Sequence, residues 1–115
     1  LNSLALVEKS TFPIFFIVIN NQGGGIFSFL PVAEKKELFE SLIATSHNYS
    51  FEHAARMFSL PYYKVTCWEE WLMTWQEVQE KKGHCLIEYC TERELNVEHH
   101  TAFKEAVQKA LYAFL

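Results

Sequence analysis

Three consecutive glycines that follow an apolar run constrain the fold of this chain more than any other feature. Residues 14–19 (Ile-Phe-Phe-Ile-Val-Ile) are β-branched or aromatic, which predicts a short parallel strand that is buried on both faces. Two asparagines, a glutamine and the three glycines occupy residues 20–25, and the apolar residues 26–30 then resume a helical course. A strand, a glycine-rich turn and a helix start predict a ligand site beyond the carboxyl end of the strand, where backbone N–H groups favour anions.

The usual nucleotide-binding motifs do not match this stretch. A P-loop requires Gly-Lys-Ser or Gly-Lys-Thr after its glycines, and the dinucleotide fingerprint spaces its glycines as Gly-x-Gly-x-x-Gly, whereas residues 23–25 are contiguous glycines. An Asn side-chain oxygen beside a backbone carbonyl is instead a neutral pair of hard ligands that can fill part of an octahedral Mg²⁺ shell. Asn and Gly are also ordinary turn formers, so residues 20–25 alone leave a plain loop open.

Hydrophobic periodicity predicts that helices and strands alternate along the rest of the chain. The expected helices cover residues 1–9, 34–43, 51–58, 68–82 and 96–115, and the expected strands cover residues 14–19, 62–66 and 84–90. This alternation predicts an α/β fold of three α/β/α layers around a parallel sheet. The last helix is expected to close the domain with its apolar face. Glu88, inside the third strand, predicts little by itself.

Composition and charge exclude several classes of partner. A net charge of −4 with only ten Lys and Arg argues against a nucleic acid partner. No apolar stretch approaches the roughly 20 residues of a membrane span, and no leader peptide is visible. Cys67, Cys85 and Cys90 are odd in number and lack Cys-x-x-Cys spacing, which predicts reduced thiols. A reducing compartment is therefore expected, either the cytoplasm or a plastid stroma.

The stretch from Asn20 to Pro31 resembles a known signature. Its Asn-Asn after a hydrophobic strand resembles the second half of the thiamine-diphosphate signature, and Asn-Asn-Gln-Gly-Gly-Gly-Ile-Phe-Ser-Phe-Leu-Pro is similar to the string of the 2-succinyl-5-enolpyruvyl-6-hydroxy-3-cyclohexene-1-carboxylate synthase (MenD) family. Residues 1–4, 46–47 and 51–55 resemble further blocks of that family. The resemblance is strongest over residues 1–60, and beyond them only element order and spacing are expected to agree.

The resemblance implies a thiamine-diphosphate-binding fold that holds its cofactor through Mg²⁺ or Mn²⁺. By position, the Asn21 side chain and the Gly23 carbonyl would ligate the metal, and Asn20 would support them. Ile26 and its apolar neighbours would contact the cofactor. The cofactor-binding residues implied in this way are Asn20, Asn21, Gly23, Gly24, Ile26, Phe27 and Leu30. No catalytic residue is implied within this chain, and neither Arg56 nor Arg93 is given a site role.

The family's activity, implied by the same resemblance, joins decarboxylated 2-oxoglutarate to isochorismate in menaquinone or phylloquinone synthesis, in a homodimer or homotetramer. The family's signature opens with Gly-Asp, which would lie just before Leu1. We therefore expect residues 1–115 to be the C-terminal portion of the cofactor domain, to lack one metal-ligating carboxylate and to be inactive alone. Two alternatives stay open: an acetolactate- or benzoylformate-type enzyme, and a non-catalytic binding or interaction domain on the same fold.

Overall fold

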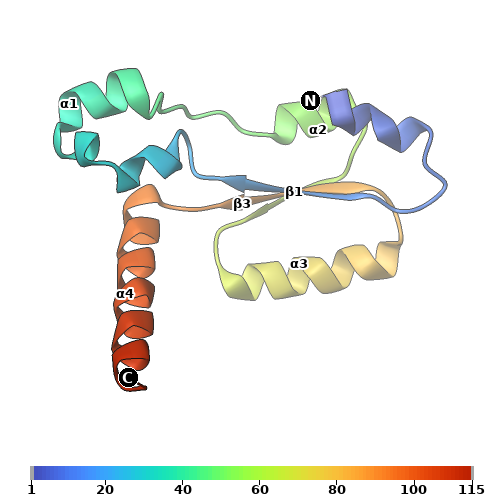
Figure 1. Ribbon diagram of the computed structural model, residues 1–115. Helices are drawn as coiled ribbons and strands as arrows, with labels where there is room; N and C mark the ends of the chain where they lie inside the picture. Colours follow the sequence, from blue (N-terminus) through green and yellow to red (C-terminus); the bar gives the residue numbers. More distant parts are fainter. Residues whose placement is uncertain (1, 115) are drawn as a thin grey trace. The chain divides into compact units, whose positions relative to one another are not determined.

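Three parallel strands form the centre of the first of two units into which the chain divides (Figure 1). The computed structural model describes residues 2–114, and this unit comprises residues 2–20 and 48–91. Its strands are β1 (Phe15–Asn20), β2 (Tyr62–Val65) and β3 (Cys85–Cys90), in the order β1-β3-β2. Both outer strands pair with β3 in parallel. The prediction of an α/β fold with a parallel sheet is confirmed.

Helices cover both faces of this sheet. The 3₁₀ helix η1 (Asn2–Glu8) and the helix α2 (Glu52–Met57) lie on one face, and α3 (Trp68–Lys81) lies on the other (Figure 1). Each face has its own cluster of buried side chains. The first cluster contains Leu4, Ala55, Leu60 and Leu86, and the second contains Val65, Val78, Cys85 and Ile87. This unit therefore has the three predicted layers.

The aromatic residues of α3 supply much of the second cluster. Trp71 and Trp75 stack with their ring centroids 5.7 Å apart, and the edge of Phe15 meets Trp75 at 5.5 Å. Aromatic pairs of this kind add about 0.5–1.5 kcal/mol beyond the area that they bury. Trp68 and Leu72 of the same helix are 60% and 45% exposed, so not every large apolar side chain of α3 is covered.

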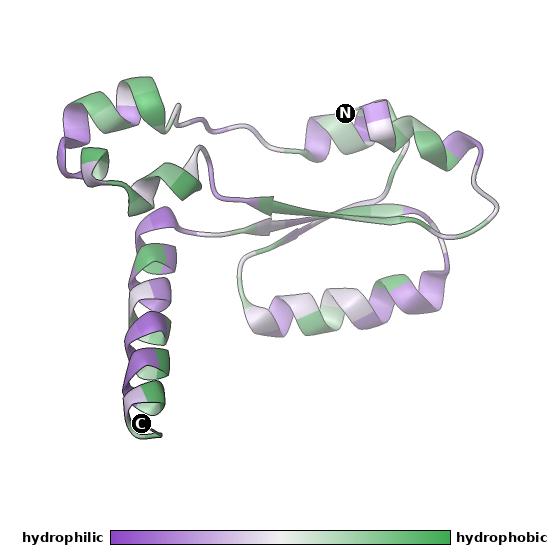
Figure 2. Cartoon of the chain, in the orientation of Figure 1, coloured by the Kyte–Doolittle hydropathy of each residue, from purple (hydrophilic) through white to green (hydrophobic). Residues whose placement is uncertain are grey.

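The expectation that the first strand is covered on both faces is wrong. Ile17 and Ile19 of β1 are 47% and 62% exposed, whereas Phe16 and Val18 pack against the first cluster. The reason is the strand order, which leaves β1 with a neighbour on one side only. The central strand β3 is the covered one, since its first four residues are all buried. Figure 2 shows the hydrophobic colour running along β1, while α3 carries both colours.

The second unit comprises residues 21–47 and 92–114 and contains no strand among its described residues. Its elements are the 3₁₀ helices η2 (Gly25–Phe29) and η3 (Pro31–Glu34), the α-helical turn α1 (Lys36–Leu38), the π-helical turn η4 (Phe39–Ile43) and the helix α4 (Arg93–Tyr112).

A continuous helix over residues 34–43 was predicted from the apolar spacing, and this prediction is wrong. The chain passes there from 3₁₀ through α to π geometry. At the end of this segment the Ala44 amide donates to the Phe39 carbonyl at 2.8 Å, and the Ala44 carbonyl accepts the Gly24 amide at 2.7 Å. Phe39 and Ala44 are the buried residues of the segment. The π-helical turn ends where the segment contacts residues 21–25, which we call the glycine loop. The spacing of apolar residues does not predict this contact.

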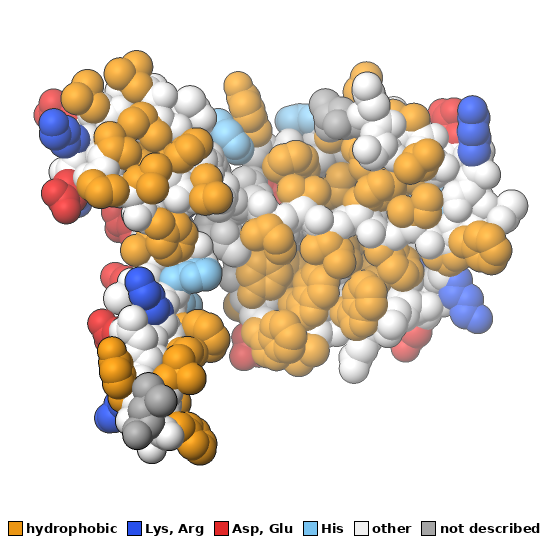
Figure 3. Space-filling model, in the orientation of Figure 1, with side chains coloured by type: hydrophobic (Ala, Val, Ile, Leu, Met, Phe, Trp, Pro, Cys, Tyr) orange, Lys and Arg blue, Asp and Glu red, His pale blue; other side chains and the backbone are white. Residues whose placement is uncertain are grey.

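The expectation that α4 closes a domain stays a prediction, because α4 and the sheet belong to different units. No residue of α4 is buried within the second unit, and its Phe103 and Leu111 are 71% and 60% exposed. Figure 3 shows hydrophobic side chains at the surface of this helix. An amphipathic pattern predicts an apolar face but does not supply the surface that covers it. Leu1 and Leu115, which the predicted terminal helices include, lie outside the described residues. Across residues 2–114 no helix combines the length and apolar character that a bilayer crossing requires.

Candidate functional site

The glycine loop turns sharply because two of its residues have positive φ. Gln22 has φ of 57° and Gly23 has φ of 140°. A Cβ atom on Gly23 would lie 2.7 Å from the Ala44 carbonyl oxygen, and one on Gly25 would lie 2.6 Å from Asn21 Nδ2. Gly23 requires glycine, since its contact is with backbone and its φ is 140°, whereas at Gly25 the Asn21 side chain would have to shift. The glycines therefore allow the loop to pack closely on its own asparagine and on residue 44.

All three glycine amides of the loop donate hydrogen bonds to acceptors within the second unit. Gly23 N donates to Asn21 Oδ1 at 3.2 Å, Gly24 N to the Ala44 carbonyl at 2.7 Å, and Gly25 N to the Gly23 carbonyl at 2.6 Å. An N–H group has one hydrogen to give, so in this conformation none of the three is available to an anion. The expectation that these amides bind an anionic group is therefore wrong for this conformation. Any anion at the loop has to be held by other means.

The oxygens of the loop remain suited to a cation. Asn21 Oδ1 accepts a hydrogen bond from the Gly23 amide, and the Gly23 carbonyl oxygen accepts one from the Gly25 amide. A carbonyl oxygen has two lone pairs. Neutral amide and carbonyl oxygens are ligands that Mg²⁺ accepts. This donor set fits part of a divalent cation shell. Within residues 2–114, no three His, Cys, Asp or Glu side chains lie together in a way that could hold a metal ion.

The apolar side chains after the loop are exposed. Ile26, Phe27 and Leu30 are 74%, 40% and 50% exposed, although all three are large and hydrophobic. Phe27 also packs on the loop, because a Cβ atom on Gly24 would lie 2.7 Å from its ring. The structure thus presents an apolar surface directly after the two candidate ligands. That this surface contacts a cofactor stays a prediction.

Asn20 belongs to the first unit and is 5% exposed. Its Nδ2 donates to Glu88 Oε1 at 2.6 Å and to the Tyr49 carbonyl at 3.2 Å, and its own carbonyl accepts the Thr91 amide at 2.9 Å. These bonds fix the carboxyl end of β1. A supporting role for Asn20 at a metal site stays a prediction.

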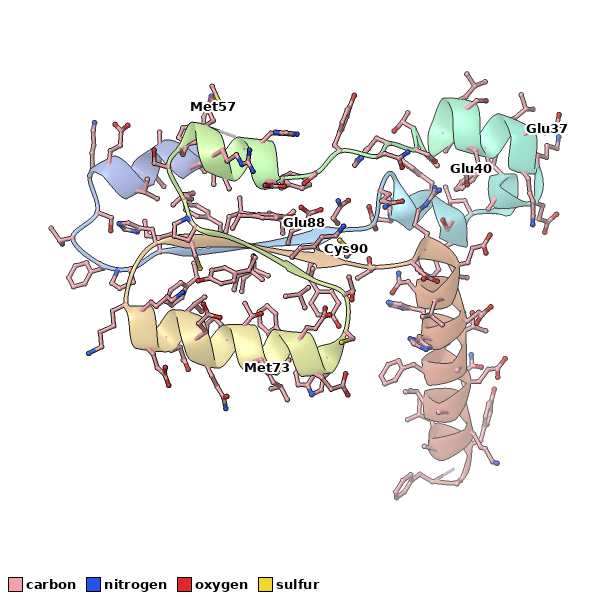
Figure 4. The ribbon with its side chains drawn as sticks, turned by 180° about the vertical axis from the view of Figure 1, so that it is seen from behind. Glu37, Glu40, Met57, Met73, Glu88 and Cys90 are labelled. Carbon is pink, nitrogen blue, oxygen red and sulfur yellow. The ribbon has the colours of Figure 1, made fainter. Side chains whose placement is uncertain are left out.

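Glu88 is the buried acid that sequence reasoning did not select. It is 2% exposed and faces α2 from the middle of β3 (Figure 4). Besides the bond from Asn20, its Oε2 accepts from Tyr62 Oη at 2.7 Å and from Phe51 N at 2.9 Å. Burial raises the pKa of the Glu88 carboxyl, but these hydrogen bonds together outweigh burial and hold the pKa below its usual value. Burial and the Glu88 carboxylate raise the pKa of Tyr62 to about 12.

No local signal could have found this network. The nitrogen and hydroxyl donors to Glu88 lie 26, 37 and 68 residues away in the sequence, and the fold brings them together. A buried carboxylate without donors is very costly, so an acid inside a buried strand does indicate that donors converge on it. Their identities are not readable from the chain.

Curated proteins named 2-succinyl-5-enolpyruvyl-6-hydroxy-3-cyclohexene-1-carboxylate synthase match almost the whole chain. The one from Chlorobium chlorochromatii is 37% identical over 108 residues, which are 94% of this chain and 18% of that protein. The one from Pelodictyon phaeoclathratiforme is 39% identical over 108 residues, again 94% of this chain and 18% of that protein. The one from Bacillus cytotoxicus is 40% identical over 100 residues, 87% of this chain and 17% of that protein.

These matches extend the resemblance well beyond residue 60, because 108 aligned residues cannot end there. The expectation that only element order agrees after that point is therefore too narrow. The chain spans less than a fifth of the length of these curated relatives. No protein-family model matches the chain.

Proposed function

Over the segment that it shares with them, the chain belongs to the family of 2-succinyl-5-enolpyruvyl-6-hydroxy-3-cyclohexene-1-carboxylate synthases, and we propose that it supplies part of a site for thiamine diphosphate. The observation that carries this proposal is the pair of oxygens in the glycine loop. Asn21 Oδ1 and the Gly23 carbonyl provide two hard ligands for Mg²⁺ or Mn²⁺. The cation in turn holds the diphosphate, which accords with glycine amides that are already engaged.

Each part of the segment has a separate task in this proposal. Asn21 and Gly23 orient the cation, and the glycines around them let the backbone approach it. Ile26, Phe27 and Leu30 provide apolar surface that excludes water from the cofactor. Bound thiamine diphosphate supplies the carbanion chemistry, and the chain supplies binding and orientation.

The activity proposed for the whole protein is a decarboxylating carboligation. It joins 2-oxoglutarate, after loss of CO₂, to isochorismate in menaquinone or phylloquinone synthesis, within a homodimer or homotetramer. Residues 1–115 are the C-terminal portion of the cofactor domain in this proposal. They contribute two of about six ligands in a Mg²⁺ shell. The isolated chain is therefore expected to be inactive and to bind the cofactor weakly.

Grafting this chain into a relative tests the proposal. In the synthase from Bacillus cytotoxicus, the 100 matching residues are replaced by those of this chain. The hybrid is expected to consume 2-oxoglutarate when isochorismate is present, and Asn21→Ala is expected to lower that rate about tenfold or more, as losses around metal ligands do. Asn48→Ala, which removes an exposed amide, is the matched control. An Asn21→Ala hybrid as active as its parent would contradict the proposal.

The same hybrid separates the alternatives. An acetolactate-type enzyme would prefer pyruvate to 2-oxoglutarate, so the two decarboxylation rates distinguish it from the proposed synthase. Isothermal titration of Mg²⁺ and thiamine diphosphate into the isolated chain adds a check that does not depend on the hybrid. Tight binding there would show that two ligands suffice and would contradict the proposed division of the site.

A further inference from the structure

Arg93 joins two separate parts of the second unit. It is the first residue of α4, and its side chain is only 18% exposed. Its Nη2 donates to Glu40 Oε2 at 2.7 Å and to Ser46 Oγ at 3.0 Å, while Ser46 Oγ in turn donates to Glu40. Glu40 projects from η4 (Figure 4). The guanidinium therefore ties the start of α4 to the segment that precedes residue 47.

Residues 44–47 of that segment pack against the glycine loop. The His47 amide donates to the Gln22 carbonyl at 3.0 Å, and the Gly24 amide donates to the Ala44 carbonyl at 2.7 Å. A Cβ atom on Gly23 would lie 3.1 Å from Ser46 Cα. The loop therefore rests on residues 44–47, and whatever fixes Ser46 also limits how the loop can move.

Arg93 also contacts the loop directly. A Cβ atom on Gly25 would lie 2.6 Å from Asn21 Nδ2 and 3.5 Å from Arg93 Cγ. Gly25 is buried, and both side chains lie next to it. The aliphatic part of the Arg93 side chain therefore lies against Gly25, and the Asn21 amide packs against the same residue.

The second guanidinium nitrogen has an unusual environment. Arg93 Nη1 is buried and has no hydrogen-bond partner among residues 2–114. A buried donor without a partner costs free energy, and such costs are accepted where a residue has a further task. A surface ion pair that served stability alone would carry no such cost.

We propose that Arg93 is a positioning residue that holds Asn21 and Gly23 in the geometry required of metal ligands. This inference rests on the proposed function. Arg93 itself does not touch the cation. Its guanidinium fixes Ser46 and Glu40 behind the loop, and its stem fixes Gly25 beside Asn21. Loss of the guanidinium frees the loop to sample other turns, which separates the two ligand oxygens.

Amide hydrogen exchange on the whole chain, followed by NMR, tests this role without any ligand. In Arg93→Met, exchange at the Gly24 amide is expected to accelerate on the order of tenfold, as for the loss of one hydrogen bond to a charged group. Exchange at the Leu86 amide, which donates to the Pro61 carbonyl in the first unit, is expected to stay unchanged. Arg93→Lys keeps the charge and should restore part of the protection. Unchanged exchange at Gly24 in Arg93→Met would overturn the proposal.

Arg56→Met is the matched control, because Arg56 makes a similar pair with Glu52 at 2.6 Å on α2 of the first unit. It is expected to leave exchange at Gly24 unchanged. Glu40→Gln is a milder variant that keeps the fold of the second unit, and it should accelerate exchange at Gly24 by a smaller factor. If Arg56→Met acted on Gly24 as strongly as Arg93→Met, the effect would be general and the proposal would be wrong.

Paramagnetic broadening by Mn²⁺ in the presence of thiamine diphosphate connects the loop to its ligand. Wild-type resonances of Asn21 and Gly23 should broaden first, and Arg93→Met should require roughly tenfold more Mn²⁺, in line with losses of outer-shell partners. Faster exchange at Gly24 with unchanged Mn²⁺ broadening would contradict a positioning role. If the wild-type chain shows no broadening at Asn21, the proposed function fails for this chain, while the exchange result still decides whether Arg93 holds the loop.

Discussion

The two units of the chain are stabilised in different ways. The first unit buries two clusters of side chains on opposite faces of its sheet. The second unit buries Phe39, Ala44 and Gly25 among its described residues, and none along α4. Burial of a large apolar side chain stabilises a fold by about 1.5–3 kcal/mol. The first unit thus has a core of its own, whereas the second depends on turn hydrogen bonds and on the Arg93 ion pair.

This difference distinguishes the unit with the buried clusters from the unit that carries the candidate ligands. The residues that stabilise the first unit differ in type from the candidate ligands. They are mainly large apolar residues, such as Leu, Ile, Val and Trp, at regular spacing. The candidate ligands Asn21 and Gly23 lie in a loop with positive φ and close backbone contacts. Loops of this kind commonly carry function on a rigid scaffold. Four experiments test this difference between the two units.

The largest expected effect is on the core of the first unit. Ile87→Ala empties a fully buried position in β3 and is expected to lower the free energy of unfolding by roughly 2–5 kcal/mol. Ile26→Ala in the second unit removes a side chain that is 74% exposed and should cost less than about 0.5 kcal/mol. Urea unfolding measures both: tryptophan fluorescence reports the first unit, where Trp71 and Trp75 lie, and far-ultraviolet circular dichroism also reports the helices of the second unit. Equal effects of the two variants would remove the distinction between the units.

Glu88→Gln is expected to cost about 1–3 kcal/mol, because one of the donors around the carboxylate is left without an acceptor. The folded-state pKa of Glu88 lies below its usual value of 4.5, so its stabilising contribution is present above that pH and is lost as the pH falls through the folded pKa. The difference in stability between wild type and Glu88→Gln should therefore shrink in acid.

Glu80→Gln, at an exposed position on α3, is the control for this titration. It should leave the stability as it is in wild type. A stability difference between wild type and Glu88→Gln that is the same at pH 3 and pH 7 would show that the buried carboxylate is not charged.

Gly23→Ala tests the loop of the second unit. The change places a Cβ atom 2.7 Å from the Ala44 carbonyl at a φ of 140°, a strain of about 1–3 kcal/mol that the loop can relieve by moving. NMR shifts of Asn21 and Gly24 should therefore change, while those of β3 should not. Gly83→Ala has no neighbour closer than 4.0 Å and is the matched control. Unchanged loop shifts in Gly23→Ala would mean that the close contacts are absent in solution.

The smallest effect concerns thiol reactivity in the first unit. Burial raises the pKa of the Cys85 thiol to about 11 and also raises that of Cys90. The thiolate is the reactive form, so alkylation at pH 8 should modify half-buried Cys67 first and Cys85 last. Mass spectrometry of timed samples gives this order, and in denaturant the three rates should converge. Early modification of Cys85 would show that the core of the first unit opens readily.

The elements with strong periodicity were predicted closely from the sequence. The helix expected over residues 68–82 is α3 (Trp68–Lys81), and the strand expected over residues 84–90 is β3 (Cys85–Cys90). Local spacing of apolar residues decides these elements. The exposure of Ile19 was missed because strand order is a property of the whole sheet.

The candidate site was predictable only as a list of residues. Asn21 and Gly23 were selected by resemblance, whereas the engagement of the Gly24 amide depends on Ala44, which is distant in the sequence. Glu88 and Arg93 were not selected at all. Both act through partners dozens of residues away, and such pairings follow from the fold and not from any local pattern.

The central claim is that the Asn21 side chain and the Gly23 carbonyl bind a divalent cation that carries a diphosphate. Crystals grown with Mn²⁺ and thiamine diphosphate test it directly, through an anomalous difference map at the manganese absorption edge. We predict a peak within bonding distance of both Asn21 Oδ1 and the Gly23 carbonyl oxygen, with the diphosphate beside it. Manganese found only at surface carboxylates such as Glu69 or Glu94, with nothing at the glycine loop, would contradict the account.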